Sequence, residues 1–334
     1  MRDAIFQTRI TDLLGIRHPI LCGGMGPRVS DARYVAAVVN AGGMGFIVAA
    51  GHESTDAFAD ELRLCRELTG GKPFGVNLYV SRRPGSVEAL QAIIPLLADH
   101  GVSCVETAGA NPADLIPPLR EAGIRIIHKA PGVRYALTAQ RMGVDAVIVV
   151  GYECGGHPGT KLIGTMVQAA RAPQAIDIPV VIAGGIGTGR QLAAALAMGA
   201  DAVLMGTRML VSEELWIHPD HKARLAAADG TESVIIKTLL RDHHRVLDNP
   251  GAQAVLALEA QGITEYAAYR DLISGVHTHA GYRSGDIEKG TYDWGQSAIF
   301  AGETKPVAAI FDELLDDAMA AMDRMRGVRL QEQT

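Results

Sequence analysis

The stretch VVIAGGIGTGRQLAAALAMGADAVLMGTRML, residues 180–210, contains a complete strand–helix–strand unit. Four apolar residues run into a Gly-Gly pair, a helical pattern follows, and a second apolar run ends in Met-Gly-Thr. Apolar strands joined by a helix indicate parallel pairing in a sheet that is covered on both faces. We therefore interpret this stretch as one strand–helix unit of a parallel α/β fold.

The same alternation extends toward the N-terminus. Helical segments with glycine stop signals separate short apolar runs. The runs are 19–25, 44–50, 74–80, 103–109, 125–131, 145–151, 179–185 and 201–207. Eight such units predict a closed (β/α)8 TIM barrel rather than an open sheet.

The alternation stops after residue 207. Residues 218–249 and 251–275 have helical patterns, whereas 276–297 is rich in glycine and polar residues. The amphipathic stretch 305–327 is then interpreted as the eighth barrel helix. We expect a barrel formed by residues 1–211 and 300–334, with a small, mainly helical domain inserted at residues 212–299.

Composition narrows the class of protein. The chain has 334 residues, a net charge of −6 and four cysteines without a CxxC pair. It shows no basic stripe and no apolar stretch of 18 residues, and it lacks a signal-peptide pattern. We therefore expect a cytoplasmic protein with reduced thiols, without nucleic-acid or membrane partners.

Glycines at the ends of the last two strands predict a phosphate site, because backbone N–H groups at such loops and at helix N-termini bind phosphate. The candidates are Gly184 and Gly185, the helix start at 187–189, and residues 205–207. A dinucleotide-binding turn fits less well, since Arg190 stands where its third glycine is required. Helix–strand packing is the remaining explanation for these glycines.

The loop GYECGGHPG, residues 151–159, follows the sixth strand. In a barrel of this kind, catalytic groups lie at the carboxyl ends of strands, so His157 is a candidate. Cys154 and His157 have the spacing of half a metal site, but no second pair matches it, and we predict no metal. Glu153 is expected to brace the loop. A histidine that only caps loop carbonyls is the alternative for His157.

In combination, these motifs resemble the 2-nitropropane dioxygenase-like flavoproteins. That family includes nitronate monooxygenases, NAD(P)H:quinone reductases and flavin-dependent enoyl-acyl-carrier-protein reductases. The resemblance covers nearly the whole chain, from HPILCGGM and NAGGMGFIVAAG through PFGVNL and VIHKA to ECGGHPG and residues 180–210. It implies a barrel that binds FMN, with the flavin phosphate held by the glycines of the last two strands.

The resemblance also implies roles for individual residues. His157 would contact the substrate, through a hydrogen bond to a nitro or carbonyl oxygen or as a base. Lys129 would reach the N1/O2 edge of the flavin, where a cation stabilises its reduced, anionic form. The other implied flavin contacts are Gly24, Met25, Asn77, Gly155, Gly156, Gly184, Gly185, Met205, Gly206 and Thr207.

Three functions remain open at this point. The first is oxidation of an alkyl nitronate, or a similar carbanion, with O2. The second is reduction of a quinone, or of an enoyl or cyclic-ketone thioester, with NADH or NADPH as electron donor. A non-catalytic flavin-binding protein is the third, and a homodimer is possible for each.

Overall fold

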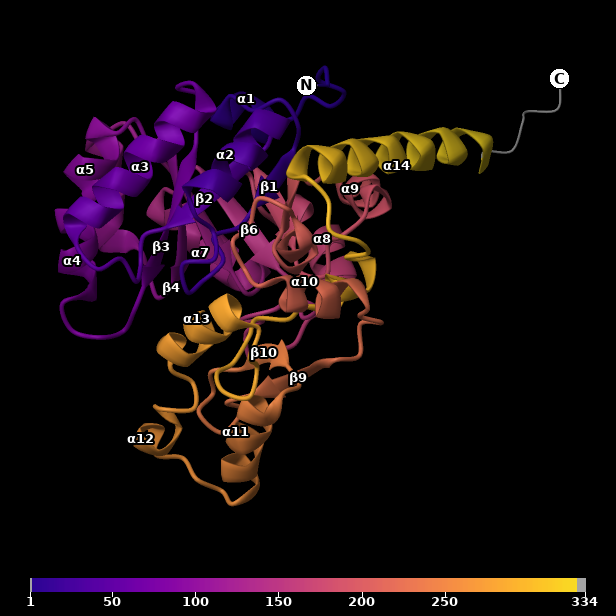
Figure 1. Cartoon of the computed structure of the whole chain (residues 1–334). Coiled ribbons are helices and arrows are strands. Elements are labelled where there is room, and N and C mark those ends of the chain that lie inside the picture. Colours follow the sequence, from indigo (N-terminus) through magenta and orange to yellow (C-terminus); the bar gives the residue numbers. More distant parts are fainter. Residues whose placement is uncertain (1, 329–334) are drawn as a thin grey trace, which may run out of the picture.

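Eight parallel strands close into a barrel in chain order, with β8 beside β1. This computed structural model describes residues 2–328, and Figure 1 shows the barrel surrounded by its helices. The strands are β1 Ile20–Cys22, β2 Met44–Val48, β3 Gly75–Val80, β4 Cys104–Gly109, β5 Arg125–Ala130, β6 Ala146–Val150, β7 Val180–Ala183 and β8 Ala202–Met205. The predicted (β/α)8 fold is confirmed.

The helices between the strands form the outer layer. They are α2 Ala32–Ala41, α3 Thr55–Thr69, α4 Ser86–Ala92, α5 Ile94–Asp99, α6 Ile116–Glu121, α7 Val133–Met142, α8 Thr165–Ala175 and α9 Gly189–Ala197. The long helix α14, Val307–Val328, packs against α9 and α2 and completes the ring. The stretch predicted as the eighth barrel helix therefore forms α14 and lies between α9 and α2 in the outer layer.

The barrel interior is a packed core. Leu21, Phe46, Ile148 and Leu204 belong to one buried cluster of inward-facing side chains. Helix α1, Arg9–Leu14, contributes to the same cluster and is tied by Arg9 to Asp201, just before β8. Helix α1 therefore closes the amino end of the barrel. Full burial of each large apolar side chain contributes about 1.5–3 kcal/mol.

Between β8 and α14 the chain forms an inserted segment, which lies below the barrel in Figure 1. It contains η2 Thr207–Val211, α10 Pro219–Ala226, β9 Ser233–Ile236, β10 His244–Leu247, α11 Pro250–Ala260, α12 Tyr266–Tyr269, α13 Gly275–Ser284 and η3 Gln296–Phe300. Ile236, Val246, Val255 and Tyr269 form a small core of its own. That residues 212–299 make up a separate domain stays a prediction.

One expectation for this segment is wrong. Residues 233–247, expected to be helical, form an antiparallel hairpin in which Ile236 pairs with His244. The runs Ser-Val-Ile-Ile and His-Arg-Val-Leu contain β-branched residues that favour strands, and left-handed residues at Lys237 and Arg241 shape the turn between them. Conversely, part of the polar stretch after residue 275 forms helix α13.

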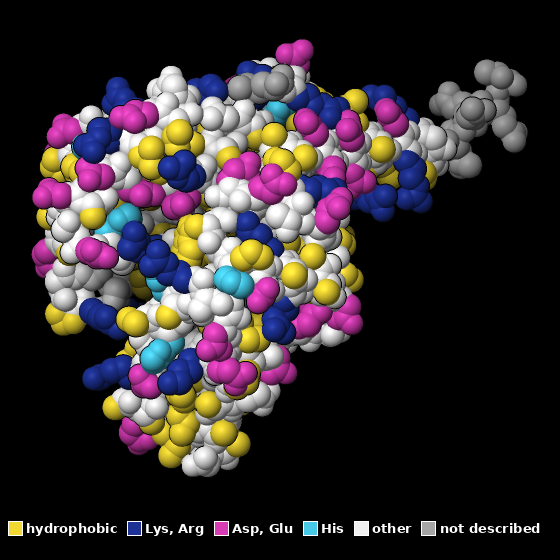
Figure 2. Space-filling model, in the orientation of Figure 1, with side chains coloured by type: hydrophobic (Ala, Val, Ile, Leu, Met, Phe, Trp, Pro, Cys, Tyr) yellow, Lys and Arg dark blue, Asp and Glu magenta, His cyan; other side chains and the backbone are white. Residues whose placement is uncertain are grey.

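Acidic and basic side chains are mixed over the face of the molecule shown in Figure 2, in keeping with the small net charge. Among residues 2–328, no helix has both the length and the apolar character that crossing a bilayer requires.

Candidate active site

A buried carboxylate organises the carboxyl ends of β3, β4 and β5. Glu106 is fully buried, and its Oε2 accepts hydrogen bonds from Asn77 Nδ2 at 2.6 Å and from the Gly24 amide at 3.0 Å. Its Oε1 lies 2.6 Å from Lys129 Nζ. The strand register explains this grouping. Asn77 of β3 pairs with Glu106 of β4, and on the other side of β4, Glu106 pairs with Ile127 of β5. Lys129 lies two residues after Ile127 on the same strand.

In the loop after β1, the backbone amides of Gly24 and Met25 already donate hydrogen bonds within the protein. The Gly24 amide is bonded to Glu106, and the Met25 amide donates to Ser30 Oγ at 3.0 Å. A Cβ on Gly24 would lie 2.4 Å from Asn77 Cβ, so a glycine is required by this close packing. The predicted flavin contacts of Gly24 and Met25 stay a prediction, and their amide groups are already engaged.

The loop after β6 is fixed from both sides. Glu153 accepts hydrogen bonds from the backbone N and the Oγ1 of Thr165, at the start of α8, which is the bracing role expected for it. A Cβ on Gly155 would lie 2.7 Å from the Gly295 amide. Gly156 exchanges two backbone hydrogen bonds with Arg245 of β10. These glycines therefore pack the loop against the inserted segment, and their contact with a flavin stays a prediction.

His157 lies against the β9–β10 hairpin. Its Nε2 is 3.1 Å from Lys237 Nζ and 3.7 Å from Asp242 Oδ1, and its ring stacks on His244 at 4.3 Å between centroids. His244 Nε2 in turn lies 2.6 Å from Asp293 Oδ1. The partners of the predicted catalytic histidine thus come from the inserted segment and not from the barrel.

The charges of this cluster influence one another. Burial lowers the pKa of His157, although an exposed fraction of 44% moderates that contribution, and the neighbouring His244 and Lys237 lower it further. Burial alone would raise the pKa of Asp242, but His157 and Lys237 lower it overall. Burial would likewise raise the pKa of Asp293, but its hydrogen bond to His244 and the nearby charges lower that pKa overall. Burial, Lys237 and His244 therefore favour a neutral His157, against the opposing effect of Asp242 and Asp293.

Cys154 has no reactive character. Burial raises the pKa of its thiol to about 12, so the side chain stays protonated at neutral pH. Within residues 2–328, no three His, Cys, Asp or Glu side chains are grouped closely enough to hold a metal ion.

The start of α9 differs from the expected phosphate site. The amides of Gly187 and Thr188 donate to Gln191 Oε1, and the Gln191 amide donates to Thr188 Oγ1. The Arg190 amide is bonded to Asp317 of α14. A capping box and α14 therefore already engage several donors of this helix N-terminus, and its role in binding phosphate stays a prediction.

Other backbone donors remain at the ends of β7 and β8. The amides of Gly185, Gly206 and Thr207 have no hydrogen-bond partner within residues 2–328. A Cβ on Gly206 would meet no atom within 4 Å, so open space adjoins this residue. Together with the cationic Lys129, these donors fit the phosphate and ring of a flavin.

Two of the predicted contacts are arranged differently. Met205 is buried in the outer layer, between the strands and the helices, and its carbonyl accepts from the Gly23 amide at 3.0 Å. Gly184 packs where a Cβ would lie 2.7 Å from the Gly151 carbonyl. The structure therefore does not bring the Met205 side chain to the barrel opening, and Gly184 has a packing role.

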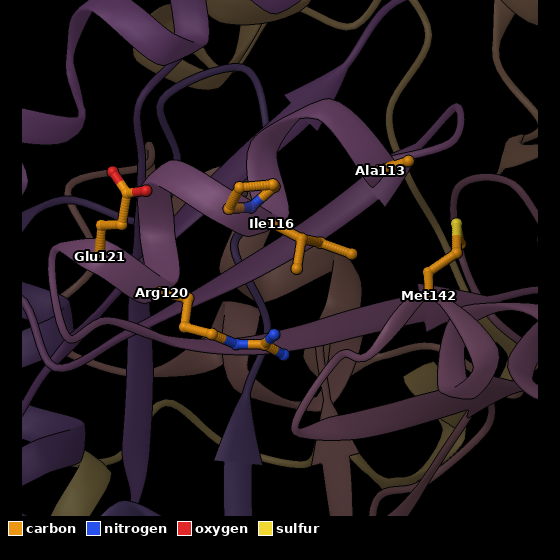
Figure 3. Close-up of a pocket in the computed structure, with 6 residues that line it drawn as sticks. Ala113, Ile116, Arg120, Glu121 and Met142 are labelled. Carbon is orange, nitrogen blue, oxygen red and sulfur yellow. The ribbon is translucent and has the colours of Figure 1, made fainter.

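Figure 3 shows a depression on the outer wall, between α6 and α7. It is lined by Ala113, Ile116, Pro117, Arg120, Glu121 and Met142. None of these residues ends a strand, and Arg120 is engaged with the Gly143 carbonyl at 2.7 Å. We assign this depression no role in the site.

A comparison with known protein families finds a match over most of the chain. The family model described as nitronate monooxygenase matches residues 7–317. The chain belongs to the nitronate monooxygenase family. A probable nitronate monooxygenase of Staphylococcus saprophyticus is 33% identical over 73% of this chain and 79% of its own length. The recognition made from the sequence motifs is confirmed.

Other proteins similar to this nitronate monooxygenase family member are named as different enzymes. An indene-carboxyl-CoA dehydrogenase of Rhodococcus jostii is 36% identical over 72% of this chain, which spans only 66% of that enzyme. The structure of FabK from Thermotoga maritima matches 97% of this chain and 100% of its own at 34% identity, with a TM-score of 0.88. A nitroalkane oxidase from Streptomyces ansochromogenes matches 95% of this chain and 100% of its own at 28% identity, with a TM-score of 0.79. Family membership supports a flavin-dependent oxidoreductase that acts on a small molecule.

The sequence motifs did not reveal every residue of the site. The role of Glu106 depends on the pairing of its strand with two neighbouring strands, which the motifs do not show. Lys237, Asp242, His244 and Asp293 lie 80 or more residues after His157 in the chain. Their only signal was a density of charged and histidine residues in the inserted segment, which is typical of any polar surface.

Proposed function

We propose that this chain is an FMN-dependent oxidoreductase of the nitronate monooxygenase type, which oxidises an alkyl nitronate or a similar carbanion with O2. The observation that carries the proposal is the group Asn77, Glu106 and Lys129 at the carboxyl ends of three adjacent strands. A buried carboxylate fixes an amide and an ammonium group there, and Lys129 remains partly exposed. This is the arrangement expected beside a ring that takes up negative charge.

We assign a proposed role to each group of residues at the carboxyl end of the barrel. Gly185, Gly206 and Thr207 would donate backbone hydrogen bonds to the flavin phosphate, whereas Lys129 and Asn77 would contact its ring. The flavin, when bound, supplies the electron-accepting chemistry. His157 would bind the oxygen atoms of the substrate from the side of the inserted segment, and the β9–β10 hairpin would help to exclude water.

A second candidate is reduction of a quinone or an acyl thioester with NADH or NADPH. It is favoured by the similarity to FabK over the full length of both chains and by the CoA dehydrogenase among the relatives. The two activities would use the same flavin site and differ in the electron donor.

The visible spectrum of the purified protein, with FMN added, tests the cofactor. Anaerobic additions then separate the two functions: bleaching by an alkyl nitronate alone supports the oxidase, and rapid bleaching by NADH or NADPH supports the reductase. A preparation that takes up no FMN would contradict both, and a flavin that no donor bleaches would indicate a non-catalytic protein. Gel filtration of the same sample tests the proposed homodimer.

A further inference from the structure

Lys237 is a buried lysine that faces the candidate catalytic histidine. Only 6% of its surface is exposed, and its backbone is left-handed, with φ +60°. Its Nζ lies 2.6 Å from Asp242 Oδ2 and 3.1 Å from His157 Nε2. An ammonium group next to a carboxylate has hydrogens left to donate, and His157 is the neighbour that receives one.

The contact decides which ring nitrogen carries the proton. An ammonium group has donors and no acceptor, so the Nε2 atom that it contacts accepts the hydrogen bond. A neutral imidazole with an accepting Nε2 is protonated on Nδ1. Within residues 2–328, Nδ1 of His157 has no hydrogen-bond partner in the protein, so its N–H is available to a ligand.

Residues of the inserted segment hold this geometry. His244 stacks on the His157 ring with 12° between the planes and is itself bonded to Asp293. The two backbone hydrogen bonds between Gly156 and Arg245 attach the loop of His157 to the hairpin that carries Lys237. The groups facing His157 are thus two cations or potential cations, Lys237 and His244, and two carboxylates, Asp242 and Asp293.

We infer that Lys237 is a positioning residue that keeps His157 neutral with its proton on Nδ1, so that the histidine meets the substrate as a hydrogen-bond donor and not as a base. The inference rests on the proposed function, in which His157 contacts the substrate. A donor suits both candidate activities, because a nitronate oxygen and a thioester carbonyl are acceptors. No base is needed for a nitronate, which is already deprotonated.

The same contact gives a balanced route for a proton. If Nδ1 gives its proton to a substrate anion, Nε2 can accept one from the Lys237 ammonium. The lysine then regains a proton from water on the side of Asp242, whose side chain is 55% exposed. One proton enters from solvent for each one delivered, and no electron moves in these steps.

NMR spectroscopy can measure directly which ring nitrogen of His157 is protonated. Full-length, flavin-loaded protein is labelled with 15N-histidine, and two-bond 1H–15N spectra are recorded as a function of pH. One of the eleven histidine signals is assigned to His157 by its loss in His157→Asn. We expect a protonated Nδ1 and an unprotonated Nε2 at pH 7. A wild-type His157 with a proton on Nε2, alone or on both nitrogens, would overturn the inference.

Variants test the role of the lysine. Lys237→Met keeps a long side chain at this position. It should shift His157 toward the Nε2–H form and raise the pKa of His157. Turnover should fall about 10- to 100-fold, with little change in KM. Lys237→Arg should retain the Nδ1–H form, and Lys289→Met, an exposed control in the same segment, should change nothing. An unchanged His157 signal in folded Lys237→Met would contradict the inference. Flavin bleaching is measured separately, so failure of the proposed function is distinguished from failure of this inference.

Discussion

Lys129 Nζ lies 2.6 Å from Glu106 Oε1, and this ion pair joins a fully buried carboxylate to an ammonium group at the barrel opening. The carboxylate also receives hydrogen bonds from Asn77 and from Gly24, so three groups depend on one side chain. A ligand that contacts Lys129 or Asn77 therefore meets side chains whose positions are already determined.

Replacing this carboxylate should cost stability. Glu106→Gln removes the partner of a largely buried cation, and we expect the free energy of unfolding to fall by about 2–3 kcal/mol, below the range for fully buried pairs because Lys129 is partly exposed. Urea denaturation of the flavin-free protein provides the measurement. Glu121→Gln, an exposed change on α6, is the control and should stay within about 0.5 kcal/mol. Equal stabilities of the two variants would show that the ion pair contributes nothing.

The open space at Gly206 leads to a prediction about FMN. An added Cβ on Gly206 meets no protein atom. Gly206→Val should therefore cause no side-chain clash in the flavin-free protein but weaken FMN binding at least about tenfold, or about 1.4 kcal/mol. Titration by flavin fluorescence measures the affinity. Gly327→Val, also facing open space but on α14, should bind FMN normally, and unaltered affinity in Gly206→Val would remove this residue from the phosphate site.

The histidine on the loop after β6 should matter for turnover and not for the cofactor. His157→Asn is expected to keep the yellow colour and to lose about 10²- to 10³-fold in kcat, the usual range for removal of a hydrogen-bond donor at the reacting centre. Steady-state kinetics with nitronate, and with NADH or NADPH plus a quinone, would measure the loss. Turnover equal to that of the unmodified protein would leave His157 without a catalytic role.

Acid should destabilise the fold through a different histidine. His128 is buried, its Nδ1 lies 2.9 Å from Thr107 Oγ1, and burial lowers its pKa from 6.5 to about 4. The unfolded chain binds this proton more readily than the native state, so His128 has no effect above pH 6.5 and reduces stability as the pH falls from 6.5 toward 4. At pH 5 the loss is about 2 kcal/mol.

Comparison with His128→Asn isolates this contribution, because the other histidines are common to both proteins. The difference in unfolding free energy between pH 7.5 and pH 5 should be smaller in the variant by about 2 kcal/mol. The same pH dependence in both proteins would show that His128 accepts a proton without unfolding.

The barrel could be predicted from the sequence because its signals are local. Each apolar run lies next to its helix and glycine stop, and the order of eight such units determines the topology. The inserted hairpin was missed because four-residue runs such as Ser233–Ile236 are too short for periodicity to separate strand from helix. What decides their structure is pairing with residues 244–247 and the left-handed turn between the two strands.

The site could be predicted only in part, for a similar reason. Residues at strand ends, such as Asn77, Lys129 and His157, could be found from the alternation of strands and helices and from the family motifs. Their partners depend on contacts between segments far apart in the chain, as between His157 and Lys237. The capping of α9 by Gln191 was also missed, although a Thr followed three residues later by a Gln is a recognised pattern.

The position of α14 has a consequence for synthesis of the protein. This helix covers α2 and α9, with Phe311 close to Gly43 and the Leu314 carbonyl close to Gly189, yet it is made only after the whole inserted segment. While the ribosome is still translating the inserted segment, the apolar faces of α2 and α9 have nothing to cover them. A nascent chain that ends before Val307 should therefore remain dependent on chaperones until α14 emerges and packs on these two helices.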